Sequence, residues 1–277
     1  MELTVNGHMV YAATGGRPFN REAPVVVFLH GAGCDHTNWQ LQSRWFAWHG
    51  HSVLAVDLPG HGRSQGPALA SLEEMVGWVG ALLKAAGVER AALVGHSLGG
   101  AIAVEAAAAL GASITRIALI GTAAAIPVSE GLLSAARDTP ERAYQMMTTW
   151  AHGTDAKIGG NPVPGLWMTG GTMAVFARNG AGVLHTDLAA CANWKTGPRA
   201  AKAVRCPALV IIAANDVMTP ARKGRELASL IEGSRTVTIP RCGHMLMAEA
   251  PDAVLDALIG FFASAATTSP SKDGVPA

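Results

Sequence analysis

The stretch AALVGHSLGGAIAVE, residues 91–105, predicts a short buried strand that turns at once into a helix of small residues. The turn itself is GHSLG, residues 95–99. A serine between a strand and a helix adopts a strained backbone conformation, and a glycine on either side leaves room for it. This geometry exposes the Oγ atom of Ser97 and directs the amide of Leu98 toward an oxygen that gains negative charge. One turn therefore predicts both a nucleophile and an oxyanion donor.

The alternative for this turn is a glycine-rich connection in which Ser97 only caps the helix. The chain holds 32 glycines among 277 residues, so Gly-x-Ser-x-Gly is a weak signal when it stands alone. The strand before the turn and the helix after it form the context that favours the catalytic interpretation.

The composition is typical of a soluble globular protein, with 49% apolar residues and a formal net charge of +1, which implies no nucleic-acid partner. The first residues, MELT, lack the charged and apolar regions of a signal peptide, and no stretch approaches the roughly 18 apolar residues of a membrane span. We therefore expect a cytoplasmic protein. Four cysteines without paired spacing fit reduced thiols and argue against a zinc site or a disulfide frame: Cys34, Cys191, Cys206 and Cys242. No metal and no cofactor are predicted.

Continuous apolar runs at 25–29 and 52–57 are typical of strands that are buried on both faces. Each run ends in a glycine-rich loop, HGAG at 30–33 and DLPGHGRS at 57–64. In a parallel sheet these loops lie at the same edge, where ligands bind. The two loops therefore place a site at the carboxyl ends of the strands.

Further apolar runs predict strands at 114–120, 208–213 and 234–239, with helices at 72–86 and 251–262 between or after them. This alternation predicts an α/β fold with a mostly parallel central sheet flanked by helices. At the start of the chain, short strands at 3–5 and 9–12 flank Asn6-Gly7, which predicts an antiparallel hairpin at the edge of the sheet.

The alternation of strands and helices stops between residues 126 and 199, where glycines and prolines separate helical segments such as 141–150 and 173–179. A loop of that length without structure is implausible in a compact domain. We therefore predict a core of residues 1–126 and 200–264, an inserted helical cap of residues 127–199 and a disordered tail of residues 265–277.

The cap and the loops near it contribute methionines and tryptophans that suit an adaptable apolar pocket. The candidates are Met146, Met147, Trp150, Trp167, Met168 and Met173 in the cap, and Met218 and Met245 outside it. For each cap residue, packing of the cap against the core is an equal alternative. The cap lacks a cluster of Arg or Lys that could recognise a strongly anionic substrate, and Arg178 and Lys195 are the basic residues that such a substrate would require.

A serine nucleophile needs a base and an acid that orients the base. Among ten histidines, His244 has the best context, because it follows the last strand in the loop PRCGH. Three others, His30, His61 and His96, are expected to have structural roles. For the acid we favour Asp216, which follows the strand at 208–213 and precedes His244 by one helix and one strand.

Asp57 is the rival acid, because it too lies at the end of a strand. Its position before Leu58-Pro59-Gly60 suits a carboxylate that braces a loop. Asp216 is therefore the preferred partner of His244.

The GHSLG turn, Asp216 and His244 occur in the order Ser, Asp, His, and together with HGAG and DLPGHGRS they strongly resemble the α/β-hydrolase superfamily over about residues 3–262. The resemblance implies that Ser97 is the nucleophile, His244 the general base and Asp216 its orienting acid. It also implies that the amides of Ala32 and Leu98 form the oxyanion hole.

Many chemistries share this fold, so residue identity has to narrow the choice. The haloalkane dehalogenases and epoxide hydrolases of the superfamily attack with a carboxylate at the position of Ser97, and the latter also use cap tyrosines, whereas this chain has only Tyr11 and Tyr144. We therefore expect a serine hydrolase that cleaves carboxylic esters of small to medium apolar acyl groups through an acyl-enzyme, with an ester and water as its partners. The alternatives are a thioesterase, a lactonase, a perhydrolase, a C–C bond hydrolase or a non-catalytic small-molecule receptor.

Overall fold

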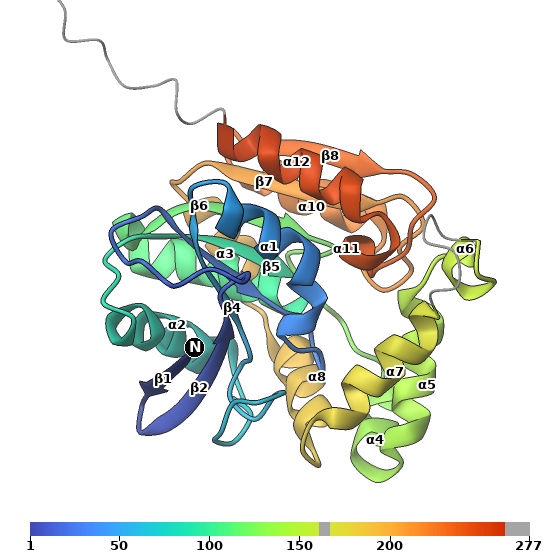
Figure 1. Cartoon of the computed structure of the whole chain (residues 1–277). Coiled ribbons are helices and arrows are strands. Elements are labelled where there is room, and N and C mark those ends of the chain that lie inside the picture. The colour runs from blue at the N-terminus through green and yellow to red at the C-terminus, as the bar shows by residue number, and fades with distance from the viewer. Residues whose placement is uncertain (161–166, 264–277) are drawn as a thin grey trace, which may run out of the picture.

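The structure, a computed structural model, describes residues 1–160 and 167–263. In this part of the chain, eight strands form one sheet in the order β1-β2-β4-β3-β5-β6-β7-β8 (Figure 1). Neighbouring strands from β4 to β8 in this order pair in parallel, whereas β2 pairs antiparallel with both β1 and β4. The strands are β1 Glu2–Val5, β2 His8–Ala13, β3 Val25–Leu29, β4 Ser52–Val56, β5 Ala91–His96, β6 Ile114–Ile120, β7 Ala208–Ala213 and β8 Arg235–Ile239. The predicted α/β fold with a mostly parallel sheet is confirmed.

The predicted hairpin at the start of the chain is present, with Val5 opposite His8 in the register of β1 and β2. Asn6 and Gly7, which connect the strands, have φ angles of 49° and 83°. Two consecutive residues with positive φ are what a type I′ turn requires, and Asn-Gly is the pair that adopts them most readily. The dipeptide therefore explains both the turn and the register.

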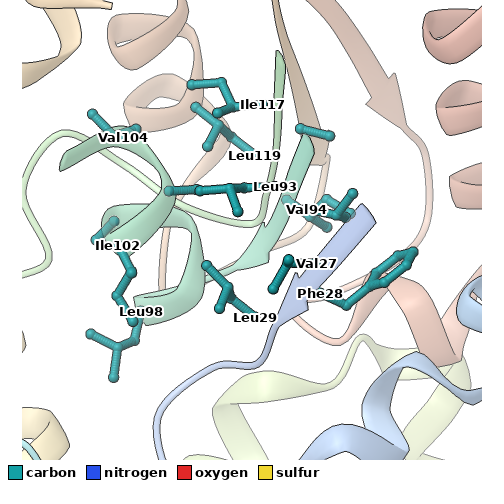
Figure 2. Close-up of a cluster of buried hydrophobic side chains, with 14 of the residues drawn as sticks. Val27, Phe28, Leu29, Leu93, Val94, Leu98, Ile102, Val104, Ile117 and Leu119 are labelled. Atoms are coloured by element: carbon teal, nitrogen blue, oxygen red, sulfur yellow. The ribbon is translucent and has the colours of Figure 1, made fainter. Parts of the chain in front are cut away.

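The centre of the sheet is buried on both faces, and every residue of β3, β4, β5 and β7 is buried. Phe28 pairs with Val94 in the register of β3 and β5, and the two side chains lie on one face of the sheet, whereas Leu29 and Leu93 lie on the other, toward helix α3 (Figure 2). Because side chains alternate along a strand, an apolar run of this kind fills the space on both sides of the sheet.

Two layers of helices cover these faces. On one face α1 (Gln40–Trp48) contacts α12 (Pro251–Ala263). On the other, α2 (Leu72–Ala85), α3 (Leu98–Leu110), α9 (Gly197–Ala203) and α10 (Ala221–Leu230) contact one another in that order. Short helical turns complete the core: η1 His36–Trp39, η2 Gly111–Ser113 and α11 Leu246–Glu249. None of the helices in the described ranges combines the length and the apolar character that crossing a membrane needs.

The insertion after β6 is helical in its described residues. Its helices are α4 Glu130–Asp138, α5 Pro140–Ala151, α6 Thr154–Lys157, α7 Met168–Arg178 and α8 Val183–Asn193. They contact one another through α4 with α5 and α8, and through α5 with α7, and they lie beside the core at the lower right of Figure 1. The cap boundaries at 127 and 199 stay a prediction, and α9, which spans the second of them, packs on α3 and α10 of the core. The predicted tail, 265–277, lies outside the described residues.

Candidate active site

Ser97 is the last residue before α3 and has φ 51° and ψ −115°, a conformation that residues with a side chain rarely adopt. The two glycines of the turn permit it. A Cβ atom on Gly95 would lie 2.2 Å from the carbonyl oxygen of Gly99, and one on Gly99 would lie 2.2 Å from the carbonyl oxygen of Leu29. Because these are backbone atoms that cannot move aside, Gly-x-Ser-x-Gly is a steric requirement of this turn.

The strained turn is held from the neighbouring strand β6 and the loop after it. The amide of Ser97 donates to the carbonyl of Ile120 over 3.0 Å, and the hydroxyl of Thr122 donates to the carbonyl of Ser97 over 2.9 Å. Leu98 is the first residue of α3, and the first amides of a helix have no acceptor within it. The turn thus presents the hydroxyl of Ser97 beside the amino end of α3.

Asp216 and His244 form a hydrogen-bonded pair at the ends of β7 and β8. Nδ1 of His244 lies 2.7 Å from Oδ2 of Asp216, and both side chains are buried. An ionised carboxylate only accepts, so Nδ1 carries the proton and Nε2 is left as the basic nitrogen. The pair has the geometry of an acid that orients a histidine base.

Asp216 itself is fixed by the loop that follows it. Its Oδ1 accepts from the amides of Met218 and Thr219 over 2.8 and 2.9 Å, and its Oδ2 accepts from the hydroxyl of Thr219 over 2.7 Å. Burial opposes its ionisation, but the charge of His244 and the hydrogen bonds from His244 and Thr219 outweigh burial and lower the pKa of Asp216. The carboxylate is therefore ionised at neutral pH.

Ser97 and His244 both line a cavity of about 500 Å³ between the sheet and the cap helices. Ala32, the loop residue that the resemblance assigns to the oxyanion hole, lines it too. Apolar side chains form most of the remaining wall: Ile126, Pro127, Val128, Leu132, Met147, Trp150, Ala151, Phe176, Leu188, Val217, Met218 and Met245. The reactive groups thus face a space that is suited to an apolar molecule.

The rival acid, Asp57, braces the loop in which it lies. Its Oδ1 accepts from the amide and from Nδ1 of His36, both over 2.7 Å, and its Oδ2 accepts from the amide of Arg63 over 2.9 Å. Burial raises the pKa of Asp57, but these hydrogen bonds lower it by more. The carboxylate is thus engaged with His36 and not with His244.

The three other histidines of interest, His30, His61 and His96, each bond to backbone groups, and His61 does so through the carbonyl of Pro59. Nδ1 of His30 donates to the carbonyl of Gly31 over 2.9 Å while its Nε2 accepts from the amide of Leu58 over 3.1 Å. Burial, followed by the neighbouring His61, lowers the pKa of His30 to about 4, so the ring is neutral. Nε2 of His96 donates to the carbonyl of His244 over 3.0 Å, which ties the loop of His244 to the residue before Ser97.

The predicted pocket residues separate into two groups. Met147, Trp150, Met218 and Met245 line the cavity that contains Ser97. Trp167 and Met168 instead line a second cavity of about 220 Å³ beside Thr37 and Leu41, which Met245 also borders, and Met146 packs against the core.

Helical geometry explains this difference. Met146 and Met147 are neighbours on α5, and successive residues of a helix point about 100° apart. Met168 begins α7 about 12 Å before Phe176, which does reach the cavity, since a helix rises 1.5 Å per residue. Met173, on the same helix, is only partly buried.

Other residues at the site were not predicted from the sequence. Asp side chains often bond to the backbone of the turn that follows them, and Thr219 follows Asp216 at such a spacing. Thr219 could have been predicted from this spacing. Phe176 and Leu188 line the cavity from α7 and α8, but an apolar residue in an amphipathic helix carries no sign of what it faces.

The two basic residues that an anionic substrate would require are engaged with other groups. Arg178 pairs with Asp35, and Lys195 bonds to the carbonyl of Ala192.

One cluster of three possible metal ligands occurs among the described residues, formed by Asp35, His36 and Asp57. Its groups are already engaged, because Asp57 accepts from His36, and Asp35 accepts from Thr37 and Arg178. Side chains that are paired in this way hold loops together, so we assign no metal to this cluster.

Comparison with known proteins agrees with the fold. Residues 26–257 match the Alpha/beta hydrolase family. Over 236 residues the chain is 31% identical to a Klebsiella pneumoniae protein named as a carbamate hydrolase, RutD, and the match covers 80% of this chain and 85% of that protein.

Solved structures agree as well. The enol-lactonase of Burkholderia xenovorans LB400 matches with a TM-score of 0.85 at 26% identity, covering 95% of this chain and 100% of its own. A thermophilic esterase matches with a TM-score of 0.78 at 27% identity, covering 95% of this chain and 97% of its own. The chain belongs to the Alpha/beta hydrolase family.

Proposed function

We propose that this protein is a serine hydrolase that cleaves carboxylic esters of small to medium apolar acyl groups. The observation that carries the proposal is the hydrogen bond between Asp216 and His244, whose ring lines the same apolar cavity as Ser97. A nucleophile, a base and an acid that fixes the tautomer of the base are the groups that acyl transfer needs.

The positions of these groups support the following reaction. Nε2 of His244 accepts the proton of Ser97 Oγ as this oxygen attacks the carbonyl carbon of the ester. The amides of Ala32 and Leu98 stabilise the negative oxygen of the tetrahedral intermediate. His244 then protonates the departing alcohol, leaving an acyl group on Ser97. Water, deprotonated by His244, attacks this acyl group and releases the acid and the free serine.

The wall of the cavity supports an uncharged apolar acyl group. The basic residues that an anionic substrate would require, Arg178 and Lys195, have partners elsewhere. Burying a carboxylate without a partner costs several kcal/mol, as order-of-magnitude transfer energies indicate. Charged acids are therefore expected to be poor substrates.

Lactone hydrolysis is the second candidate, because the solved enol-lactonase covers nearly the whole chain at 26% identity. A lactone is a cyclic ester, so the same groups would act and the alcohol would stay attached to the released acid.

A cytoplasmic location is part of the proposal, and the four free cysteines support it, since such thiols persist in a reducing compartment.

The experiment that tests the proposal is a panel of chromogenic esters, thioesters, lactones and peroxide-dependent reactions, run on the wild type and on Ser97→Ala. Ser229→Ala, which removes an exposed serine of α10, is the matched control. We expect apolar esters to turn over fastest, Ser97→Ala to be inactive and Ser229→Ala to match the wild type. Wild-type protein that binds these compounds without turning any of them over would point to the receptor alternative instead.

A further inference from the structure

Gly33, the residue after the oxyanion-hole candidate Ala32, is held by the cap on both sides of its backbone. Its amide donates to Oδ2 of Asp187 on α8 over 2.8 Å, and its carbonyl accepts from Nδ2 of Asn179, just after α7, over 2.5 Å. A Cβ atom on Gly33 would lie 2.9 Å from the side chain of Leu184 and 3.1 Å from that of Phe176. The cap is therefore packed directly against the oxyanion loop.

The bond to Asp187 fixes the orientation of one particular peptide. Residues 31–34 form a turn that is closed by the amide of Cys34 and the carbonyl of Gly31 over 3.1 Å, and Gly33 has φ 66°, as a type II turn requires. Type I and type II turns differ by a flip of the central peptide, here Ala32–Gly33. In the flipped form the carbonyl of Ala32 would point at the carboxylate of Asp187, so this carboxylate selects the observed form.

Asp187 is fully buried, and a second buried side chain, His61, holds its carboxylate in place. Nε2 of His61 lies 2.8 Å from Oδ2 of Asp187, and Nδ1 lies 3.0 Å from the carbonyl of Pro59. A carbonyl only accepts, so Nδ1 carries a proton, and a second proton must lie between Nε2 and the carboxylate. His61 and Asp187 therefore share this second proton.

The surroundings of His61 favour its charged form. Burial lowers the pKa of His61, but the charge and hydrogen bond of Asp187, the carbonyl of Pro59 and the charge of Asp57 raise it by more, and the net direction is upward. The ring of His30, 4.9 Å away between centroids, is neutral and adds no opposing charge at neutral pH. The contact that holds Gly33 thus contains a titratable proton.

The amide of Ala32 lies in the preceding peptide, Gly31–Ala32, so fixing the Ala32–Gly33 peptide holds it through the backbone of Ala32. We propose that Asp187, held by His61, is in this way a positioning residue of the oxyanion hole, which links the seating of cap helix α8 to the alignment of the Ala32 amide. This role rests on the proposed hydrolase function. Asp187 is fully buried, so it acts through Gly33 and not on the substrate. As the pH rises and His61 loses its proton, the contact weakens and the rate of the chemical step falls.

Asp187→Asn is the informative variant, because it removes the charge that favours a protonated His61, and beside a neutral His61 an amide satisfies only one of two neighbours. With its oxygen at the position of Oδ2, the Asn side chain accepts from the amide of Gly33. With its nitrogen at that position, it donates to a neutral His61 and leaves the Gly33 amide unpaired. His61→Gln is the second variant, since it keeps an N–H donor toward Asp187 but does not titrate. Thr186→Ala, one residue away on α8, removes only a hydroxyl that bonds to the carbonyl of Gly182 and is the control.

The test measures kcat and KM for an apolar ester from pH 6 to pH 10, together with the rate at which a serine-directed phosphonate labels each variant, all per reactive site. For Asp187→Asn we expect kcat and the labelling rate to fall by about ten- to a hundredfold, less than the 10²–10³ that loss of a whole oxyanion donor costs. KM should change by less than about threefold, because the loss concerns the transition state. His61→Gln should keep most of the rate at pH 7 and lack the decline at high pH.

Equal rates per reactive site in Asp187→Asn and Thr186→Ala, or a loss confined to KM, would overturn the role of Asp187. If Asp187→Asn does not fold, His61→Gln decides, and a decline at high pH that persists in it overturns the proposal. A wild type that neither hydrolyses esters nor reacts with the phosphonate overturns the proposed function itself. A reactive wild type with an equally reactive Asp187→Asn overturns only the role of Asp187.

Discussion

Nε2 of His96 donates a hydrogen bond of 3.0 Å to the carbonyl of His244, so the residue before Ser97 holds the loop that contains His244. The two rings also lie close together, 4.7 Å between centroids. The turn and the base loop are therefore built as one unit, although 148 residues separate them in the chain.

Replacing His96 should loosen this unit. His96→Phe removes the donor and leaves the buried carbonyl of His244 unpaired, which costs about 1–3 kcal/mol of unfolding free energy. We expect a lower melting temperature and a lower kcat, measured by calorimetry and ester turnover. His8→Phe, at an exposed histidine, is the control. Equal stability of the two variants would show that the bond contributes nothing.

The two candidate acids should separate in a direct comparison. Asp216→Asn presents His244 with the wrong tautomer and should lower kcat by about 10³–10⁴ while the protein stays folded. Asp57→Asn breaks the contacts with His36 and Arg63 and should lower stability more than kcat. Both variants are measured by urea unfolding and by turnover per folded molecule. A folded Asp57→Asn with the larger loss of kcat would reverse the assignment.

Stability should depend on pH through His30, whose pKa is lowered from 6.5 to about 4 by burial and by His61. Between these values the unfolded chain binds a proton that the native protein does not, so the free energy of unfolding falls as the pH falls from 6.5 toward 4. His96, His51 and His152 have lowered pKa values too and act in the same direction.

His30→Asn keeps a donor and an acceptor but does not titrate, so the slope of unfolding free energy against pH should become shallower in this window. Urea unfolding at several pH values measures it. An unchanged slope would mean that His30 is not buried as a neutral ring.

Side chains at the ends of strands could be placed at one edge of the sheet from the sequence, whereas the side chains that face the cavity could be predicted only in part. Met147 and Trp150 line it, but Trp167 does not. Ser97, Asp216 and His244 could be predicted to lie together because each follows a strand, and parallel strands bring their carboxyl ends to one edge. Asp187 and Asn179 lie about 150 residues from Gly33 in the chain, and only the docking of the cap brings them together. Trp167 looked like a pocket residue by its type, but its position at the start of α7 places it at another cavity.

The wall of the cavity should set acyl-chain preference weakly. A buried methylene adds about 0.8 kcal/mol, so kcat/KM should rise by no more than about fourfold per carbon until the cavity is full. Met147→Ala enlarges the cavity and should move the optimum to a longer chain, whereas Met146→Ala, the neighbouring residue on α5, should leave it in place. Ester series from two to ten carbons measure both. A half-ester of a dicarboxylic acid that reacts fastest of all would contradict the apolar pocket.

Mass-spectrometric mapping of the residue that a serine-directed phosphonate modifies shows whether Ser97 is the nucleophile. Labelling should need a folded protein with a neutral His244, and it should be slowed in Asp216→Asn. We predict that the wild type carries one adduct, on the peptide that contains Ser97, and that Ser97→Ala carries none. An adduct on any other serine, or labelling of Ser97→Ala at the wild-type rate, would contradict the account.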